Sequence, residues 1–220
     1  MMELSPIHIR VLGTLMEKAR TTPEVYPLTL NSLVNACNQK TSRDPISDYD
    51  EDEVLRALDD LRDEALVMRV DMAGSRVAKF RENLTSQWEL TTEEYALLAV
   101  LFLRGPQTPG QLRQRTDRLH PFTNLEKTVE QLDAMKSRDE EPFCLVQTLE
   151  RLPGTKEIRF AHTLLPLDES VPAVSTQGKA PSPPDENAGN ENCSSDLVAR
   201  IDELEKRLND LEALINELIS

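Results

Sequence analysis

The sequence predicts a mainly α-helical protein with small β-hairpin wings, an α+β fold made of two tandem winged-helix domains plus a C-terminal coiled-coil helix. The first observation is a repeat: helix, short helix, helix, strand, turn and strand follow in that order over residues 5–80 and again over residues 91–162. That order is typical of winged-helix domains. The second observation is a run of heptads near the C-terminus. The predicted parts are domains at residues 1–86 and 87–165, a disordered linker at residues 166–195 and the coiled-coil helix at residues 196–220.

Helix caps and a hairpin define the first repeat. A serine cap followed by proline begins its first helix at Ser5. Thr29 caps a second, short helix, and Asp50 begins the third helix with a capping box. The two strands of the wing hairpin are expected at residues 66–70 and 77–80.

The second repeat shows the same signals. Thr91 begins its first helix with a capping box, and Thr108 begins a short helix directly after a glycine–proline stop. Thr123 is the expected cap of the third helix, whose inward stripe is Leu125, Val129, Leu132 and Met135. The wing strands are expected at residues 143–146 and 158–160.

Charge is distributed unevenly along the chain. The net charge is −14 over 220 residues. Residues 1–90 carry −5, residues 91–165 carry −1 and residues 166–220 carry −8. A DNA-binding domain gains most of its affinity by neutralising phosphates. The chain as a whole is therefore expected to repel DNA, and only a local basic patch could reverse that.

Signals for export, membranes, cofactors and catalysis are missing from the sequence. The N-terminus has no basic segment followed by an apolar core, and no run nears the roughly 18 apolar residues of a membrane span. Three widely spaced cysteines, Cys37, Cys144 and Cys193, argue against a disulfide framework or a zinc site. No nucleophile, acid pair or phosphate-binding glycine loop indicates catalysis. We therefore expect a cytoplasmic, non-enzymatic protein with no metal, no cofactor and no membrane partner.

Residues 37–45 form an unusually polar loop before the third helix of the first repeat. One interpretation is a long turn whose side chains satisfy buried backbone groups. The other is an interaction loop in which Lys40 and Arg43, beside Asp44, bind an anion or a partner's carboxylate.

The best basic patch of the chain lies in the second repeat. The candidate DNA- or anion-contacting residues are Arg113, Arg115, Arg118, Arg151 and Lys156, with Arg104, His120 and Arg159 close by in the sequence. A helix pair with a basic wing could hold a phosphate backbone. A solvated surface of mixed charge is the alternative, because the third helix of this repeat has no base-reading face. In the first repeat the third helix begins with a run of carboxylates at residues 48–53, where phosphates would have to come.

The heptads predict self-association. Apolar residues alternate at spacings of three and four over Leu197, Ile201, Leu204, Leu208, Leu211, Ile215 and Leu218. Isoleucine at one core position with leucine at the other favours a parallel homodimer. The alternative is an amphipathic helix that folds back on the winged-helix domains.

Several motifs make the chain similar to the YceH-like proteins of bacteria. They are YPLTLN at residues 26–31, CNQKTSRDP at residues 37–45, RGPQTPG at residues 104–110 and RQRT at residues 113–116. The resemblance covers about residues 2–165 and implies a bacterial cytoplasmic protein with two winged-helix domains. It brings no established activity, and so no catalytic or ligand-binding residues.

Two functions fit these observations. The first is a DNA-binding transcriptional regulator that acts as a homodimer, with the coiled coil presenting two copies to paired half-sites. The second is a protein–protein interaction adaptor built from tandem winged helices, with an unknown protein partner and without DNA binding.

Overall fold

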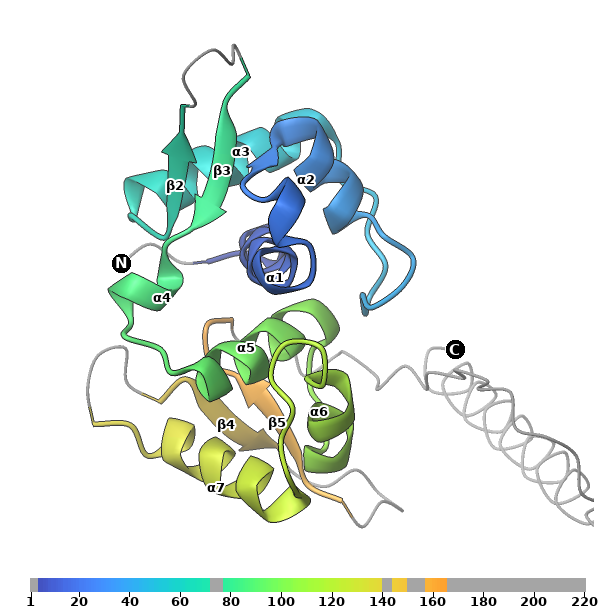
Figure 1. Ribbon diagram of the computed structural model, residues 1–220, viewed down its shortest axis with the longest axis vertical. Coiled ribbons are helices and arrows are strands. Elements are labelled where there is room, and N and C mark those ends of the chain that lie inside the picture. Colours follow the sequence, from blue (N-terminus) through green and yellow to red (C-terminus); the bar gives the residue numbers. More distant parts are fainter. Residues whose placement is uncertain (1–3, 72–76, 140–143, 150–156, 166–220) are drawn as a thin grey trace, which may run out of the picture. The chain divides into compact units, whose positions relative to one another are not determined.

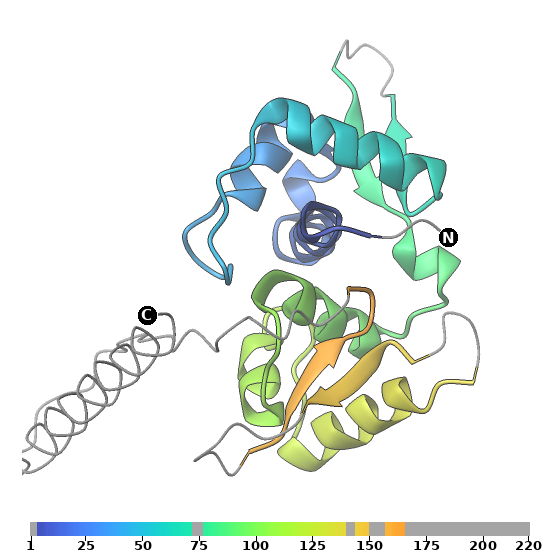
Figure 2. The same cartoon turned by 180° about the vertical axis from the view of Figure 1, so that it is seen from behind.

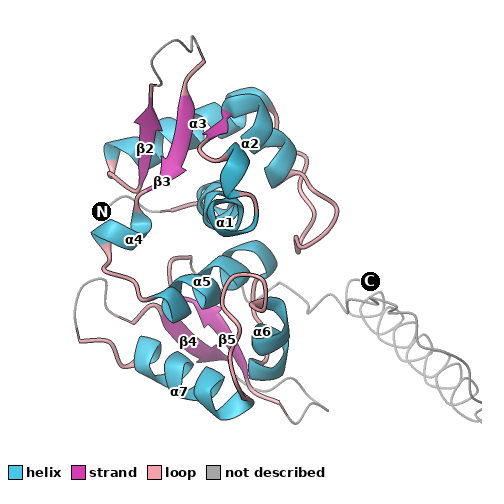
Figure 3. Ribbon diagram, in the orientation of Figure 1, coloured by secondary structure: helices cyan, strands magenta, loops and turns pink. Residues whose placement is uncertain are grey.

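The computed structural model describes residues 4–71, 77–139, 144–149 and 157–165 (Figure 1). The predicted linker and coiled-coil helix, with every residue of the predicted dimer seam, lie outside the described residues. The described residues all belong to one compact unit. The expected mixture of helices with small antiparallel sheets is confirmed (Figure 3).

The first repeat contains a helical layer and a small sheet. Its elements are α1 (Pro6–Thr21), the 3-10 helix η1 (Pro23–Val25), β1 (Leu28–Thr29), α2 (Leu30–Cys37), α3 (Glu51–Asp63), β2 (Val67–Val70) and β3 (Lys79–Glu82). Strand β3 lies between β1 and β2, antiparallel to both. The sequence did not predict β1, because two residues are too few to show strand periodicity.

The second repeat has the same order after a short connecting helix. Its elements are α4 (Leu84–Gln87), α5 (Thr92–Arg104), α6 (Pro109–Arg115), α7 (Leu125–Lys136), β4 (Val146–Leu149) and β5 (Arg159–His162). Strands β4 and β5 pair antiparallel, with Val146 opposite His162. The observed strands lie one to three residues later than the sequence indicated.

A detail of strand pairing relates the two repeats. In the first repeat Leu28, just before α2, pairs with Phe80 of β3. In the second repeat Gln107, just before α6, forms an isolated antiparallel bridge with Phe160 of β5. Both phenylalanines are buried in the core. The same short strand position therefore precedes the second helix of each repeat.

Most helix caps formed as their residues predicted. Asp50 accepts from the Glu53 backbone N–H at 2.7 Å, and Thr91 accepts from that of Glu94 at 3.2 Å. The prediction that Thr123 caps α7 is wrong, because Asn124 is the cap and accepts from the Lys127 N–H at 2.8 Å.

The inward face of α7 also differs from the predicted stripe. Thr128 is buried, and its hydroxyl donates to the Asn124 carbonyl oxygen at 3.2 Å, so a polar side chain can occupy the core there. Leu125, expected inside, is 47% exposed.

Helices α1 and α5 pack against each other and join the two repeats (Figures 1 and 2). Residues 8–16 of α1 and 94–103 of α5 are buried without a break, because each helix also faces the core of its own repeat. Gly13 permits the close approach: a Cβ atom there would lie 2.8 Å from Cβ of Phe102. The Tyr95 hydroxyl donates to the Met16 carbonyl oxygen at 2.8 Å across the same contact.

Candidate functional site

Arg43 fixes the polar loop that follows α2. Its side chain is 0% exposed. Its guanidinium donates to the Ala36 carbonyl oxygen from Nε at 3.2 Å and from Nη2 at 2.9 Å. Nη2 also donates to Oε2 of Glu17 at 2.7 Å. Arg43 therefore satisfies a carbonyl at the C-terminus of α2, where helices leave such groups without partners.

A second arginine holds the same loop from α1. Arg10 donates to the Cys37 carbonyl oxygen at 3.2 Å and to that of Pro45 at 2.5 Å. Burial lowers the pKa of Arg10, and the neighbouring Arg43 charge lowers it further. The sequence reasoning missed this role, although an arginine inside the apolar stripe of α1 was a visible signal.

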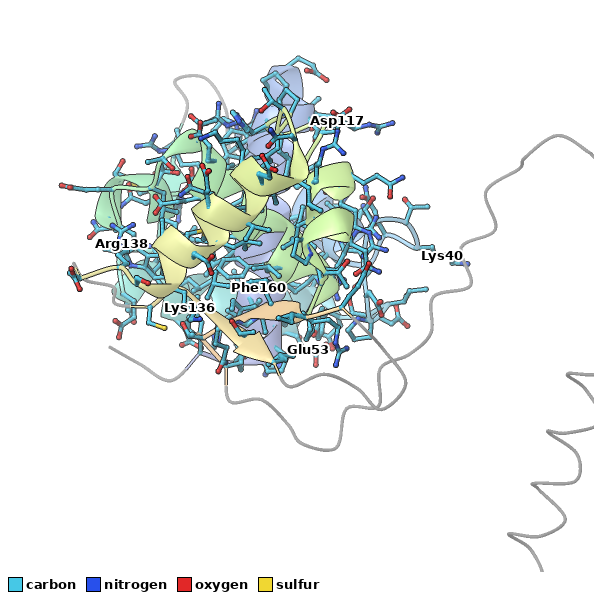
Figure 4. The ribbon with its side chains drawn as sticks, turned by 90° about the horizontal axis from the view of Figure 1, so that it is seen from below. Lys40, Glu53, Asp117, Lys136, Arg138 and Phe160 are labelled. Carbon is cyan, nitrogen blue, oxygen red and sulfur yellow. The ribbon has the colours of Figure 1, made fainter. Side chains whose placement is uncertain are left out.

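These contacts decide which loop residues are accessible. Asn38 exchanges two hydrogen bonds with the Tyr49 backbone, at 2.8 and 2.9 Å. Together with Arg43 it matches the interpretation in which the polar side chains serve buried backbone groups. Lys40 is exposed and extends away from the body of the protein (Figure 4), and Asp44 is half-buried.

The loop reaches the second repeat at Asp44. The Asp44 backbone N–H donates to the Leu103 carbonyl oxygen, 2.8 Å away in the last turn of α5. Arg104 is the last residue of α5. Gly105, with φ of 62°, caps the helix, and its N–H donates to the Leu101 carbonyl oxygen. Part of the predicted interaction loop and part of the predicted basic patch thus lie side by side.

On the second-repeat side of this contact, buried Gln107 links the backbone of Arg104 to the side chain of Arg115. Its Nε2 donates to the carbonyl oxygens of Arg104 and Pro106, both at 2.9 Å. Its Oε1 accepts a hydrogen bond from Nη1 of Arg115. Backbone hydrogen bonds to Phe160, at 2.9 and 2.8 Å, hold Gln107 in place. We call Asp44, Arg104, Gln107 and Arg115 the repeat junction.

The repeat junction carries more positive than negative charge. Burial lowers the pKa of Arg104, and the nearby Arg115 charge lowers it further. Burial also lowers the pKa of Arg115, an effect that the Asp44 carboxylate partly offsets. Among the described residues, no carboxylate lies within 4.0 Å of either guanidinium. Neither arginine therefore has an ion-pair partner in this part of the chain.

The other members of the predicted basic patch are dispersed. Arg113 is exposed on α6, and Arg118 is exposed in the turn that follows. Neither forms an ion pair with another described residue. Arg151 and Lys156 of the predicted wing lie outside the described residues.

The outward faces of α3 and α7 are acidic. The exposed charged residues of α3 are Glu51, Asp52, Arg56, Asp59, Asp60, Arg62 and Asp63, and those of α7 are Glu126, Lys127, Glu130, Asp133 and Lys136. Two of the four bases on these faces are neutralised within their helix: Arg62 contacts Asp59 at 2.7 Å, and Lys127 contacts Glu130 at 2.6 Å.

A serine, a histidine and an aspartate also meet at the start of α1. Nδ1 of His8 lies 2.8 Å from the Ser5 hydroxyl, and Nε2 lies 3.2 Å from Oδ2 of Asp60. The Ser5 backbone N–H donates to the same Nδ1 at 2.9 Å. Because this backbone N–H already donates to the lone pair of Nδ1, Ser5, His8 and Asp60 act as a helix cap and not as a nucleophile with its general base.

The described part of the chain holds no cluster of three or more His, Cys, Asp or Glu side chains arranged for a metal ion. None of its helices has the length and apolar character needed to cross a membrane.

The structure defines an α+β protein with an internal repeat and a basic junction between its two copies. A bacterial family described as "Protein of unknown function, DUF480" matches residues 4–155, and the chain belongs to this family. The match agrees with the resemblance to the YceH-like proteins.

Individual relatives extend this similarity beyond the repeats. A UPF0502 protein of Opitutus terrae is 50% identical over 181 residues, which cover 82% of this chain and 76% of that protein. One from Koribacter versatilis is 43% identical and covers 91% and 90% of the two chains. One from Shewanella halifaxensis is 39% identical and covers 99% of both.

Proposed function

We propose that this protein is a cytoplasmic, non-enzymatic protein–protein interaction adaptor built from two tandem winged-helix domains. The shared element order and the matching positions of Phe80 and Phe160 support the assignment of both repeats to the winged-helix class. The fold alone does not select a function, because winged helices serve both as DNA readers and as docking modules. The charge on the surface of the third helix in each repeat supports the docking role.

The acidic outward face of α3 is the observation that carries the proposal. A winged helix that reads DNA places its third helix in the major groove, between two rows of phosphates. The exposed face of α3 presents five carboxylates and two arginines, and that of α7 presents three carboxylates and two lysines. Inserting either face into a groove would bring like charges together, which weakens binding instead of supporting it.

The same face suits a basic protein partner. Leu55 is 38% exposed on α3, and Asp52 and Asp59 lie three residues before it and four residues after it. Residues at these spacings share one side of a helix. An apolar side chain flanked by carboxylates can anchor a partner with a complementary basic surface.

Self-association through the C-terminal heptads is a second part of the proposal. A parallel homodimer would present two copies of the α3 face, so that a partner with two binding sites gains from the higher effective concentration.

A capture experiment tests the α3 face. Full-length protein is cross-linked in cells of its own host and recovered, in parallel with an Asp52→Lys, Leu55→Lys, Asp59→Lys variant and a Glu126→Lys, Asp133→Lys control on α7. We expect a basic protein to be recovered with the wild type and the control, and to be lost with the α3 variant. Recovery of the same proteins with all three would contradict docking on α3.

A DNA-binding regulator is the second candidate. Its support is the pair of exposed arginines Arg113 and Arg118, which have no ion-pair partner among the described residues. Such a regulator requires affinity that falls steeply with salt and that is lost when α6 is made acidic.

A further inference from the structure

We propose that the outer edge of strand β2 is a docking site for strand β2 of a second copy of this chain. Antiparallel pairing of the two strands would join the small sheets of two first repeats into one continuous sheet. This inference goes beyond the adaptor function and does not depend on it, because the edge of β2 is separate from the α3 face and from the predicted heptad seam.

The outer edge of β2 lacks the features that normally prevent strand pairing. The strand order β1-β3-β2 makes β2 the outermost strand of its sheet (Figure 3). Natural edge strands are blunted by proline, by lysine or by a bulge. The four residues of β2 include no proline and no lysine, and their pairing with β3 is unbroken. Its single charged side chain, Arg69, forms an ion pair with Asp71 at 3.0 Å.

Hydrogen bonds around β2 show which of its backbone groups face outward. The Asn83 N–H donates to the Leu66 carbonyl oxygen at 2.8 Å, so the backbone groups of Leu66 face β3. The Glu82 N–H donates to the Tyr26 hydroxyl at 2.7 Å, on the side of β3 where β1 lies. Successive residues of an antiparallel strand direct their backbone groups to opposite sides. Every second residue after Leu66 therefore faces β3, and the residues between them face outward.

Arg69 and Asp71 are by this alternation the residues that can pair with another strand. On the outer side, neither has a backbone hydrogen bond to another described residue. Their side chains are 50% and 70% exposed. The edge thus offers backbone donors and acceptors beside two accessible side chains of opposite charge.

The two charges favour a second copy of β2 over an unrelated strand, and they select one register. A two-fold axis at Arg69 would set two guanidiniums opposite each other, and an axis at Asp71 would set two carboxylates opposite each other, which is unfavourable in both cases. An axis at Met68 would set Arg69 opposite an apolar residue. Only an axis at Val70 sets each Arg69 opposite Asp71 of the second copy, and it does so at positions whose backbone groups face outward.

Disulfide cross-linking of the full-length protein tests this register. Val70→Cys is introduced together with Cys144→Ser and Cys193→Ser, so that buried Cys37 is the only other thiol. An axis at Val70 brings the two Cα atoms to about 4.5 Å, within the range of a disulfide. Met68→Cys on the same strand is the matched control, because its two copies would lie about 13 Å apart.

We expect Val70→Cys to form a covalent dimer at least about tenfold faster than Met68→Cys. Equal rates, a faster reaction of Met68→Cys or no cross-link in either variant would overturn the proposal. Circular dichroism of both variants ensures that a slow reaction is not a loss of folding.

Exchanging the two charges provides a second test. In the Val70→Cys protein, Arg69→Asp or Asp71→Arg alone sets like charges opposite each other and should slow cross-linking by about tenfold. The two substitutions together restore opposite charges and should recover the rate. A double variant as slow as the single variants would contradict the pairing of Arg69 with Asp71.

The same comparison separates the edge of β2 from the predicted heptad seam. One pair of short strands is weak by itself, and a second contact between the same two chains would raise their effective concentration. In a Leu204→Lys, Leu211→Lys background we expect slower cross-linking overall, with Val70→Cys still faster than Met68→Cys. Loss of that difference would mean that the heptads alone bring the strands together, and would overturn the proposal.

Discussion

The Asp44 backbone N–H donates a hydrogen bond to the Leu103 carbonyl oxygen across 2.8 Å. This bond joins the polar loop of the first repeat to the last turn of α5 in the second. It brings together two segments that are about 60 residues apart in the sequence. The contact places Asp44 beside the last turn of α5, where Arg104 is the final helical residue.

Replacing Gly13 should destabilise the contact between α1 and α5. A Cβ atom at Gly13 would lie 2.8 Å from Cβ of Phe102, and neither backbone can move without disturbing a buried helix. We expect Gly13→Ala to lower the free energy of unfolding by about 1–3 kcal/mol, as overpacking does elsewhere. Urea denaturation followed by circular dichroism measures this.

Gly110 offers the matched control for that substitution. A Cβ there would meet only Oγ1 of Thr108, at 3.9 Å, on the short helix α6. Gly110→Ala should therefore leave stability unchanged or raise it slightly, since alanine favours helix. Equal losses in the two variants would mean that the close approach of α1 and α5 is not what Gly13 provides.

Removing Arg43 should be among the more damaging single changes. Its buried guanidinium satisfies the Ala36 carbonyl oxygen and pairs with Glu17 at 2.7 Å. Arg43→Ala removes both of these contacts and leaves Glu17 with only Lys18 among the described residues, at 3.8 Å, at a cost of about 3 kcal/mol. Thermal and urea unfolding provide the measurement, with Arg62→Ala as the control for an exposed pair, expected to cost less than about 1 kcal/mol. A loss no greater than that of the control would refute the anchoring role.

His162 should make stability depend on pH in the acid range. Burial lowers the pKa of His162 to about 4, and its ring packs edge-on against Phe102 with centroids 5.2 Å apart. Because the unfolded state binds this proton more readily than the folded state, stability is complete above the unfolded pKa of about 6.5 and falls as the pH drops toward 4. The expected loss is on the order of 2–3 kcal/mol.

A His162→Phe variant isolates this effect from the titration of carboxylates. Its stability should fall less steeply than that of the wild type between pH 6.5 and 4, although the two share every acidic residue. Urea midpoints at half-unit pH steps give the comparison. Parallel curves would show that His162 is not buried in the neutral form.

The predicted heptad seam lies within residues 197–218, and the mass of the full-length protein in solution tests it. Full-length protein should have the mass of a dimer by light scattering. Leu204→Lys with Leu211→Lys should give a monomer, since both occupy the predicted seam. Lys206→Gln lies on the opposite side of the heptad and should leave the dimer intact. A wild-type protein with the mass of a single chain would refute the seam.

Local signals were enough to predict much of each repeat. The capping residues Asp50, Thr91 and Thr108 mark helix starts because a side chain and a backbone N–H within three residues decide the outcome. Where two candidate caps are adjacent, as at Thr123 and Asn124, the local signal does not choose between them. The choice comes from the core, which accepts Thr128 and leaves Leu125 outside.

The repeat junction could not be predicted in the same way. Asp44 and Arg115 were each singled out by their residue chemistry, but as parts of two separate candidate sites. Their proximity depends on the packing of α1 on α5, which Gly13 permits and which leaves no periodic mark in the sequence. Similarly, Arg43 could be described from the sequence as either a ligand-binding or a loop-anchoring residue, and only its burial favours the anchor.

The central claim is that the acidic face of α3 serves protein contacts and that neither α3 nor α7 enters a DNA groove. Fluorescence anisotropy of full-length protein with random duplex DNA, from low to physiological salt, tests it most directly. The account predicts no binding at any salt concentration, and no change in an Arg113→Glu, Arg115→Glu variant. Binding that falls steeply with salt and disappears in that variant would contradict it and establish the second repeat as a DNA-binding domain.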